Sequence, residues 1–337
     1  MNKLFIFLCF VLSLSIIAQD FPESMHPYEN DCKTSESYSI PGAVALEITF
    51  NQLTEVEEDA DYIVLIDSNG EEVGEYTGKQ LAGLTVRIEG DTFIIQLKAD
   101  DTKNAYGYKV NSVRALYEGY RCYTSIDSID YDRISNLYED DLKAELYNLV
   151  KGHTSLGYTG ARKKMFGEFD NEGGKIRCVY TGKYVNSYGV PNSNVMNTEH
   201  TWPKSKGAGS EPAKSDLYHL FPTDSNANSR RSSYPFGITT TTKWSEGGSI
   251  LGSNSTQGTC FYPRADHRGN VARAMFYFAI RYQKSIDAAQ ERTLREWHKA
   301  DPVDAKERAR HEAIVALQKK RNPFIDHPEY VDQISDF

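Results

Sequence analysis

Cysteine is scarce in this sequence, and long apolar runs are scarcer. The chain has five cysteines among 337 residues, and no two of the last four are close enough for the paired ligand spacing of a zinc finger. Only residues 4–17 form a long apolar run, and this run is too short and wrongly flanked to span a membrane. These absences argue against a cysteine-based zinc site and against a protein with several membrane spans.

The beginning of the chain has the pattern of a secretory signal. Lys3 supplies the positive charge, residues 4–17 the apolar segment, and Ala18 a small residue before the cleavage point. We therefore expect residues 1–18 to be removed and the protein to be extracellular or periplasmic, with an uncleaved anchor as the alternative.

Four cysteines remain after the predicted cleavage. An even number in an exported chain suggests two disulfides, although four cysteines allow three pairings. The pairing that we favour joins Cys32 to Cys122 and Cys178 to Cys260.

Charge is distributed unevenly along the chain. Residues 1–115 contain 8 Lys or Arg and 19 Asp or Glu, whereas residues 116–337 contain 30 and 28. The net charge of −9 therefore comes from the first third of the chain, and the remainder can still bind a polyanion. The change in composition predicts one domain over residues 25–115 and a second over residues 116–337.

The first domain is predicted to be an all-β sandwich. Its apolar segments are short, alternating and rich in β-branched residues, and turn formers such as Asn69-Gly70 separate them. They cover residues 43–50, 62–67, 84–90 and 92–100.

Residues 197–237 carry the groups that suggest chemistry. A Glu-His pair at Glu199 and His200 is followed by an Asp-Leu-x-His-Leu-x-Pro run from Asp216 and by an Asn-x-Asn-x-Arg-Arg run from Asn226. Histidine suits a general base near neutral pH, and carboxylate and amide oxygens suit a hard divalent cation. This combination indicates a metal-assisted hydrolase.

The sequence NTEHTWP followed by KSDLYHLFPTDSNANSRRSSYPFG resembles the bacterial endonuclease I family, whose site is a ββα-metal finger. The resemblance extends over about residues 116–335 and implies an α+β catalytic domain. It implies that His200 is the general base and that Glu199 and Asn228 hold one Mg²⁺ ion, with Asn226 as the alternative ligand. It also implies cleavage of DNA and RNA to 5′-phosphate and 3′-hydroxyl ends, without sequence specificity. The second strand of the finger would cover residues 216–221, and the helix after it would begin near Asn226, with Ser225 or Asn226 as its cap. Further helices are predicted from about Arg268 and over about residues 286–299 and 303–319.

One departure from the family concerns the leaving phosphate. Some members place an arginine between the base and the second strand. Here the basic residues of the segment 203–215 are all lysines, namely Lys204, Lys206 and Lys214. The candidates for contacting substrate phosphate are Arg231, Arg264, Arg268 and Lys204, and structural ion pairs are the alternative for the arginines.

Several polar residues near the motif allow a structural reading. Asp216 is expected to orient His200 or to anchor a turn. His153, His219 and His327 are expected to be structural. Arg162 and the two lysines after it either contact the phosphate backbone or form a solvated face.

The order of segments in the first domain resembles the CUB domain, an extracellular β-sandwich that binds proteins or glycans. In calcium-binding members three acidic side chains hold the ion, and the matching positions are Glu55, Asp61 and Asp100. A solvated acidic surface is the alternative for these residues.

The sequence thus predicts an exported, monomeric, Mg²⁺-dependent endonuclease with a CUB-like domain in front. Two other functions remain open: an adhesin or glycan-binding protein with an inactive nuclease unit, and a phosphodiesterase for small molecules.

Overall fold

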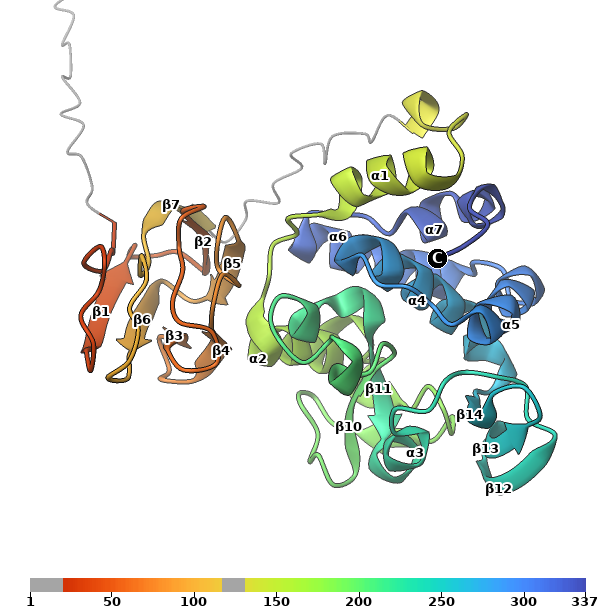
Figure 1. Cartoon of the computed structure of the whole chain (residues 1–337). Coiled ribbons are helices and arrows are strands. Elements are labelled where there is room, and N and C mark those ends of the chain that lie inside the picture. Colours follow the sequence, from red (N-terminus) through yellow and green to blue (C-terminus); the bar gives the residue numbers. More distant parts are fainter. Residues whose placement is uncertain (1–20, 117–130) are drawn as a thin grey trace, which may run out of the picture.

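The computed structural model of the chain describes residues 21–116 and 131–337. The predicted signal segment and Cys122 lie outside these residues. The described part has an all-β unit followed by a mixed α/β unit, as Figure 1 shows.

The β unit is built from two antiparallel sheets. Their strand orders are β1-β6-β3-β4 and β5-β2-β7. The strands are β1 (Lys33–Ser39), β2 (Ala45–Phe50), β3 (Tyr62–Asp67), β4 (Glu72–Tyr76), β5 (Thr85–Glu89), β6 (Thr92–Lys98) and β7 (Val110–Leu116). The four segments predicted from β-branched alternation correspond to β2, β3, β5 and β6.

Alternation explains why these segments form strands around one core. In β6, Phe93, Ile95 and Leu97 are buried while the residues between them are partly exposed, because successive side chains point to opposite faces. The β3–β4 turn is closed by Asp67, whose side chain accepts hydrogen bonds from the amides of Asn69 and Glu71.

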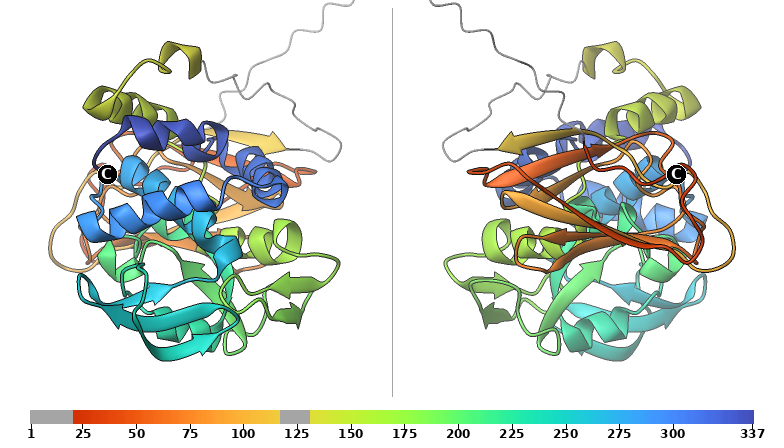
Figure 2. Two further views of the ribbon diagram at one scale, coloured as in Figure 1. Left: turned by 90° about the vertical axis from the view of Figure 1, so that its right-hand side faces the viewer. Right: turned by 90° about the vertical axis from the view of Figure 1, so that its left-hand side faces the viewer.

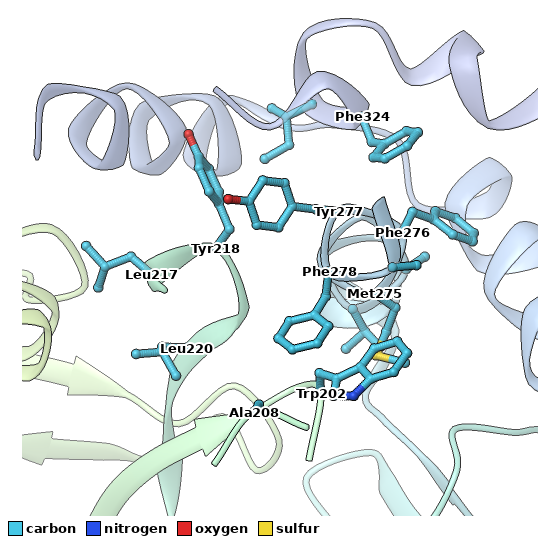
Figure 3. Close-up of a cluster of buried hydrophobic side chains, with 14 of the residues drawn as sticks. Trp202, Ala208, Leu217, Tyr218, Leu220, Met275, Phe276, Tyr277, Phe278 and Phe324 are labelled. Atoms are coloured by element: carbon cyan, nitrogen blue, oxygen red, sulfur yellow. The ribbon is translucent and has the colours of Figure 1, made fainter. Parts of the chain in front are cut away.

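The second unit is organised around helix α4 (Arg268–Tyr282), whose residues are buried on nearly all sides. Figure 3 shows the side chains of three consecutive residues leaving this helix in different directions. Phe276 packs on Phe324, Tyr277 on Tyr218, and Phe278 on Trp202, with ring centroids 5.9, 4.7 and 4.7 Å apart.

The other helices of this unit are α1 (Glu139–Val150), α2 (Gly157–Lys164), α3 (Ser225–Arg231), α5 (Ala288–Ala300), α6 (Ala305–Gln318) and α7 (Pro323–Asp326). Of these, α1, α5 and α7 pack directly on α4. The predicted helix from about Arg268 and the two predicted after it correspond to α4, α5 and α6.

Three small antiparallel sheets complete this unit. They pair β8 (Lys175–Arg177) with β9 (Tyr184–Asn186), pair β10 (Met196–His200) with β11 (Leu220–Asp224), and join β12 (Thr241–Glu246), β13 (Ser249–Asn254) and β14 (Gly258–Tyr262). The second catalytic strand was expected over residues 216–221, but it begins at Leu220. Residues 217–219 form a 3₁₀ turn instead, because Asp216 caps it by accepting from the Tyr218 amide.

The two units are in direct contact. Strand β5 pairs with Ser155, which donates its amide to Thr85 O at 2.7 Å and accepts from the Arg87 amide at 2.6 Å. Helix α2 lies beside β4 and β5, and the right-hand view of Figure 2 looks onto the β unit with the rest of the chain behind it.

The predicted disulfide between Cys178 and Cys260 is wrong, since both cysteines are free. Each has other polar neighbours: Cys178 Sγ accepts from the amides of Thr181 and Asp224, and Cys260 lies next to Asn254. The pairing of Cys32 with Cys122 lies outside the described residues. Among the residues that the structure describes, no helix combines the length and apolarity needed to cross a membrane.

Two histidines of the second unit, His153 and His267, are buried in surroundings that favour the neutral ring, although Asp216 Oδ2 lies 3.8 Å from His153 Nδ1. Burial lowers the pKa of His153 to about 4 and that of His267 to about 3. His267 packs its ring against Phe221, and its Nε2 has no hydrogen-bond partner.

These histidines should make the fold sensitive to acid. Below pH 6.5 the unfolded chain takes up protons that the folded chain excludes, so stability falls as pH falls toward the folded-state pKa. Between pH 6.5 and its folded-state pKa, each histidine should lower the free energy of unfolding by about 1.4 kcal/mol for each pH unit. We expect His267→Phe to make the loss of unfolding free energy between pH 6.5 and 4.5 smaller by about 2 to 3 kcal/mol, measured by urea denaturation. Parallel pH dependences of the parent and the variant would contradict this reading.

Candidate active site

Strands β10 and β11 and helix α3 form a compact ββα unit. Glu199 pairs with Phe221 and His200 with Leu220. Helix α3 follows β11 directly, and Asp224 caps it by accepting from the amides of Asn226 and Ala227, each at 3.0 Å. The cap was expected at Ser225 or Asn226, and its position one residue earlier sets where Asn228 falls on the first helical turn.

His200 is the last residue of β10 and is held by the backbone of the following loop. Its Nε2 lies 3.0 Å from the carbonyl oxygen of Lys214. A carbonyl can only accept, so Nε2 carries the proton and the lone pair lies on Nδ1. Burial lowers the pKa of His200 well below 6.5, and the neighbouring charges of His219 and Lys204 act in the same direction. The ring is therefore neutral at neutral pH and able to accept a proton.

Glu199 is 1% exposed and has two polar neighbours. Its Oε1 accepts from the Tyr180 hydroxyl at 2.7 Å and lies 3.2 Å from Nε of Arg231. Burial raises the pKa of Glu199, while Arg231 and Tyr180 oppose that change. A buried carboxylate in this setting gains from additional positive charge.

Asn228 has its amide nitrogen engaged. Nδ2 donates to Asn197 Oδ1 at 2.7 Å and to the Thr198 carbonyl at 3.2 Å, which leaves the side-chain oxygen to face a cation. A carboxylate and an amide oxygen are hard ligands, so Glu199 and Asn228 fit a divalent ion such as Mg²⁺. Asn226, the alternative ligand, is exposed on α3.

These side chains line one open pocket of about 500 Å³. Glu199, His200 and Asn228 are brought together there, with Lys204 and Arg231 beside them. Arg231 is itself buried: its guanidinium donates to the carbonyls of Thr201 and Ser232 besides pairing with Glu199. Its charge is therefore shared between the site and its own backbone surroundings.

The other two arginine candidates lie elsewhere. Arg264 pairs with Asp266 at 2.6 Å and lines a different cavity. Arg268 donates to the Pro263 carbonyl and stacks its guanidinium 3.8 Å from the centre of the Tyr262 ring. Both arrangements are those expected of structural arginines.

Arg162 on α2 also lines the pocket, as does Tyr158 one turn earlier. The Tyr158 ring centre is 5.6 Å from that of His200, and Arg162 lies over the same tyrosine at 5.5 Å. Within the described part of the chain, Nε of Arg162 is buried and has no hydrogen-bond partner. From the sequence, Arg162 could either contact the phosphate backbone or lie on a solvated face. Its position four residues after Tyr158, on the same side of a helix, was the feature that could have indicated a shared site.

Asp216 does not contact His200 directly. Its carboxylate accepts from the hydroxyls of Tyr277 and Tyr282 at 3.0 and 2.8 Å and from Gln318, and it caps the 3₁₀ turn. His219 donates Nε2 to the Ala213 carbonyl at 2.7 Å. Lys214, one of the three lysines of the loop 203–215, contacts His200 through its backbone carbonyl.

In the β unit, the acidic cluster differs in one member from the set predicted for calcium. Oxygen atoms of Glu57, Asp61 and Asp100 lie within 4.8 Å of one another. Glu55 instead faces Lys79 at 3.4 Å. Glu57, two residues further along the chain, lies beside Asp61 and Asp100 in place of Glu55.

Comparison with known proteins agrees with this geometry. The family model described as Endonuclease I matches residues 139–329. An extracellular ribonuclease of Bacillus subtilis (strain 168) is 34% identical over 222 residues, which cover 58% of this chain and 74% of that protein. A periplasmic deoxyribonuclease of Aeromonas hydrophila is 24% identical over 209 residues, covering 55% of this chain and 84% of that protein.

The β unit is similar to solved CUB domains. One is the MASP-1 CUB2 domain bound to Ca²⁺, with a TM-score of 0.24, 17% identity, and coverage of 27% of this chain and 85% of that chain.

The family implies a divalent metal, and the homologues are extracellular or periplasmic nucleases. Since the family model spans more than half of the chain and includes the ββα unit, this chain belongs to the endonuclease I family and is a nuclease.

Proposed function

We propose that this protein is an exported, Mg²⁺-dependent endonuclease that hydrolyses phosphodiester bonds of DNA and RNA without sequence specificity. The observation that carries the proposal is the state of His200. Its Nε2 is committed to the Lys214 carbonyl, and its Nδ1 lone pair belongs to a pocket that also contains two oxygen ligands for a hard cation. We keep residues 25–115 and 116–337 as the limits of the two domains, with a cleaved signal before them and a monomer as the expected state.

In the proposed reaction, His200 Nδ1 accepts a proton from a water molecule, whose oxygen attacks the phosphorus in line with the leaving 3′ oxygen. Glu199 and Asn228 would hold one Mg²⁺ ion, which as a Lewis acid supplies stabilisation for the charge that develops on the phosphate. Arg231 fixes the Glu199 carboxylate, and Arg162 and Lys204 supply positive charge for the phosphate backbone. The products are 5′-phosphate and 3′-hydroxyl ends.

Lack of specificity follows from the groups that line the pocket. Cationic and small polar side chains predominate there, and such groups supply the phosphate and sugar contacts that carry no sequence information. The relatives include an extracellular ribonuclease and a periplasmic deoxyribonuclease, which favours a site that accepts both sugars.

We expect residues 20–337 to nick and linearise plasmid DNA in Mg²⁺ and to lose this activity in EDTA. His200→Ala should reduce kcat by about 10²- to 10⁴-fold, because it removes the general base. Glu199→Gln should weaken metal binding, measured by calorimetry, while His200→Ala should bind metal as the parent does. Cleavage by His200→Ala at the parental rate would overturn the assignment of the base.

The same assay separates the two other functions. Turnover of a mononucleotide diester without plasmid cleavage would indicate a small-molecule phosphodiesterase. Binding of cells or polysaccharide without nuclease activity would indicate an adhesin.

Arg162 should contribute to substrate binding. We expect Arg162→Ala to lower kcat/KM by roughly tenfold or more, and the slope of log(kcat/KM) against log[salt] to fall by about one, since one phosphate contact is lost. Arg230→Ala is the matched control, because Arg230 is exposed on α3 outside the pocket lining. Equal effects of the two substitutions would show that Arg162 contributes only general surface charge.

For the β unit we propose a Ca²⁺ ion at Glu57, Asp61 and Asp100, and a protein or glycan ligand. Asp61 is fully buried and already accepts from the Tyr28 hydroxyl and the Asp100 amide, so it is preorganised at the centre of the cluster. Millimolar Ca²⁺ should raise the Tm of the parent and not that of Asp61→Asn. An equal response of the two proteins would exclude this site.

A further inference from the structure

The β unit contacts the nuclease unit at the turn that holds His200. This turn, Ala213–Ser215, is a single 3₁₀ turn, and it presents two successive carbonyls to histidines. The Ala213 oxygen receives His219 Nε2, and the Lys214 oxygen receives His200 Nε2. Any displacement of the turn therefore moves the acceptor that sets which nitrogen of His200 carries the proton.

A buried cluster ties the turn to the β unit. The Ser215 hydroxyl donates to Glu211 Oε2 and lies 3.0 Å from the Ser155 hydroxyl. The backbone N–H and C=O of Ser155 in turn form hydrogen bonds with Thr85 and Arg87 of β5. A continuous path of hydrogen bonds therefore leads from β5 through Ser155 and Ser215 to the turn that holds His200.

Glu211 lies in this cluster and is almost fully shielded from water. It is 4% exposed, and its Oε1 has no hydrogen-bond partner among residues 21–116 and 131–337. Burial raises the pKa of Glu211 to about 7, against the opposing effects of Ser215, Lys214 and the Tyr158 amide. Tyr76 of β4 is one of its neighbours, and the charge of Glu211 helps to raise the pKa of that tyrosine. The β unit thus contributes to the wall that keeps this carboxyl from water.

Helix α2, which supplies Tyr158 and Arg162 to the pocket, is held by the same contact. Lys163 pairs with Glu71 and with Asp67, and Lys164 lies 3.6 Å from Glu89. At the start of the helix, Gly157 has φ +61°, and a Cβ placed there would lie 2.1 Å from the Val73 carbonyl oxygen. Only glycine allows β4 to approach so closely.

We infer that the β unit is a structural part of the active site: its docking on Ser155, Glu211 and α2 positions the Lys214 carbonyl that holds His200. Glu211 and Ser215 are positioning residues, since they act on His200 through the turn. This inference rests on the proposed role of His200 as the base. A separate binding module would require no such buried polar contact with the catalytic turn.

The test uses full-length protein and a pair of glycine substitutions. Gly157→Ala adds a clash with β4 to the strain of a positive φ, whereas Gly152→Ala has the strain alone, with φ +70° and no atom within 4 Å of the new Cβ. We expect Gly157→Ala to lower kcat by roughly tenfold or more with a smaller change in KM, and Gly152→Ala to stay within about threefold of the parent.

A second pair of variants decides the matter if Gly157→Ala does not fold. Glu211→Gln keeps an acceptor for the Ser215 hydroxyl and should retain most of the parental kcat. Glu211→Ala removes the acceptor and should lower kcat by roughly tenfold. In ¹⁵N-histidine spectra, His200 should carry its proton on Nε2 in the parent and Glu211→Gln, and show a mixture of tautomers in Glu211→Ala.

The outcomes separate this inference from the proposed function. Parental kcat and an unchanged His200 tautomer in Gly157→Ala and Glu211→Ala would overturn the inference while leaving His200 as the base. Activity of His200→Ala at the parental rate would instead overturn the proposed function, and the inference with it.

Discussion

The hydrogen bond from His200 Nε2 to the Lys214 carbonyl is the contact on which the site depends. An imidazole that is free to exchange tautomers presents its lone pair on the correct side only part of the time. A carbonyl acceptor removes that choice, because it stabilises only the ring with its proton on Nε2. Since the acceptor is a backbone group, no side chain at position 214 is required for it. The position of the loop, rather than the identity of residue 214, therefore sets the tautomer of His200, the proposed base.

Glu199 is likewise held by only a few groups. Burial alone raises the pKa of its carboxyl, and Arg231 and Tyr180 compensate for part of that cost. One ion pair and one hydrogen bond leave the carboxylate with further capacity to accept, and the adjacent Asn228 has only its oxygen to offer. Both side chains thus retain oxygen acceptors that suit a hard metal ion, in keeping with the proposed Mg²⁺ site.

Part of this arrangement could be predicted from the sequence. Periodicity located α4, α5 and α6 and four strands of the β unit, because burial on one face or on all faces leaves a pattern in the chain. The motif around Glu199 and His200 indicated the candidate site, because residues that line one pocket are close together in sequence. The Lys214 carbonyl could not be found this way, since backbone acceptors leave no residue signature. Arg162 and Glu211 were also out of reach, because their roles depend on how distant segments pack. The predicted disulfide between Cys178 and Cys260 was wrong for a related reason. An even number of cysteines is a property of composition and does not say which sulfur atoms lie close together.

The contact between the two units places an acidic unit next to a pocket with cationic residues. Residues 1–115 contain 19 acidic and 8 basic side chains, and some of the acids, Asp67, Glu71 and Glu89, are paired with lysines of α2. Most of the remaining excess of negative charge is solvent-facing and disfavours nucleic acid over the β unit. The cationic residues of the pocket, Arg162 and Lys204, lie on the nuclease side of this boundary. We therefore expect a polyanion to be attracted to the pocket and repelled from the acidic surface of the β unit, which would restrict its direction of approach. Such restriction acts on orientation during encounter and weakens as salt screens the surface charges.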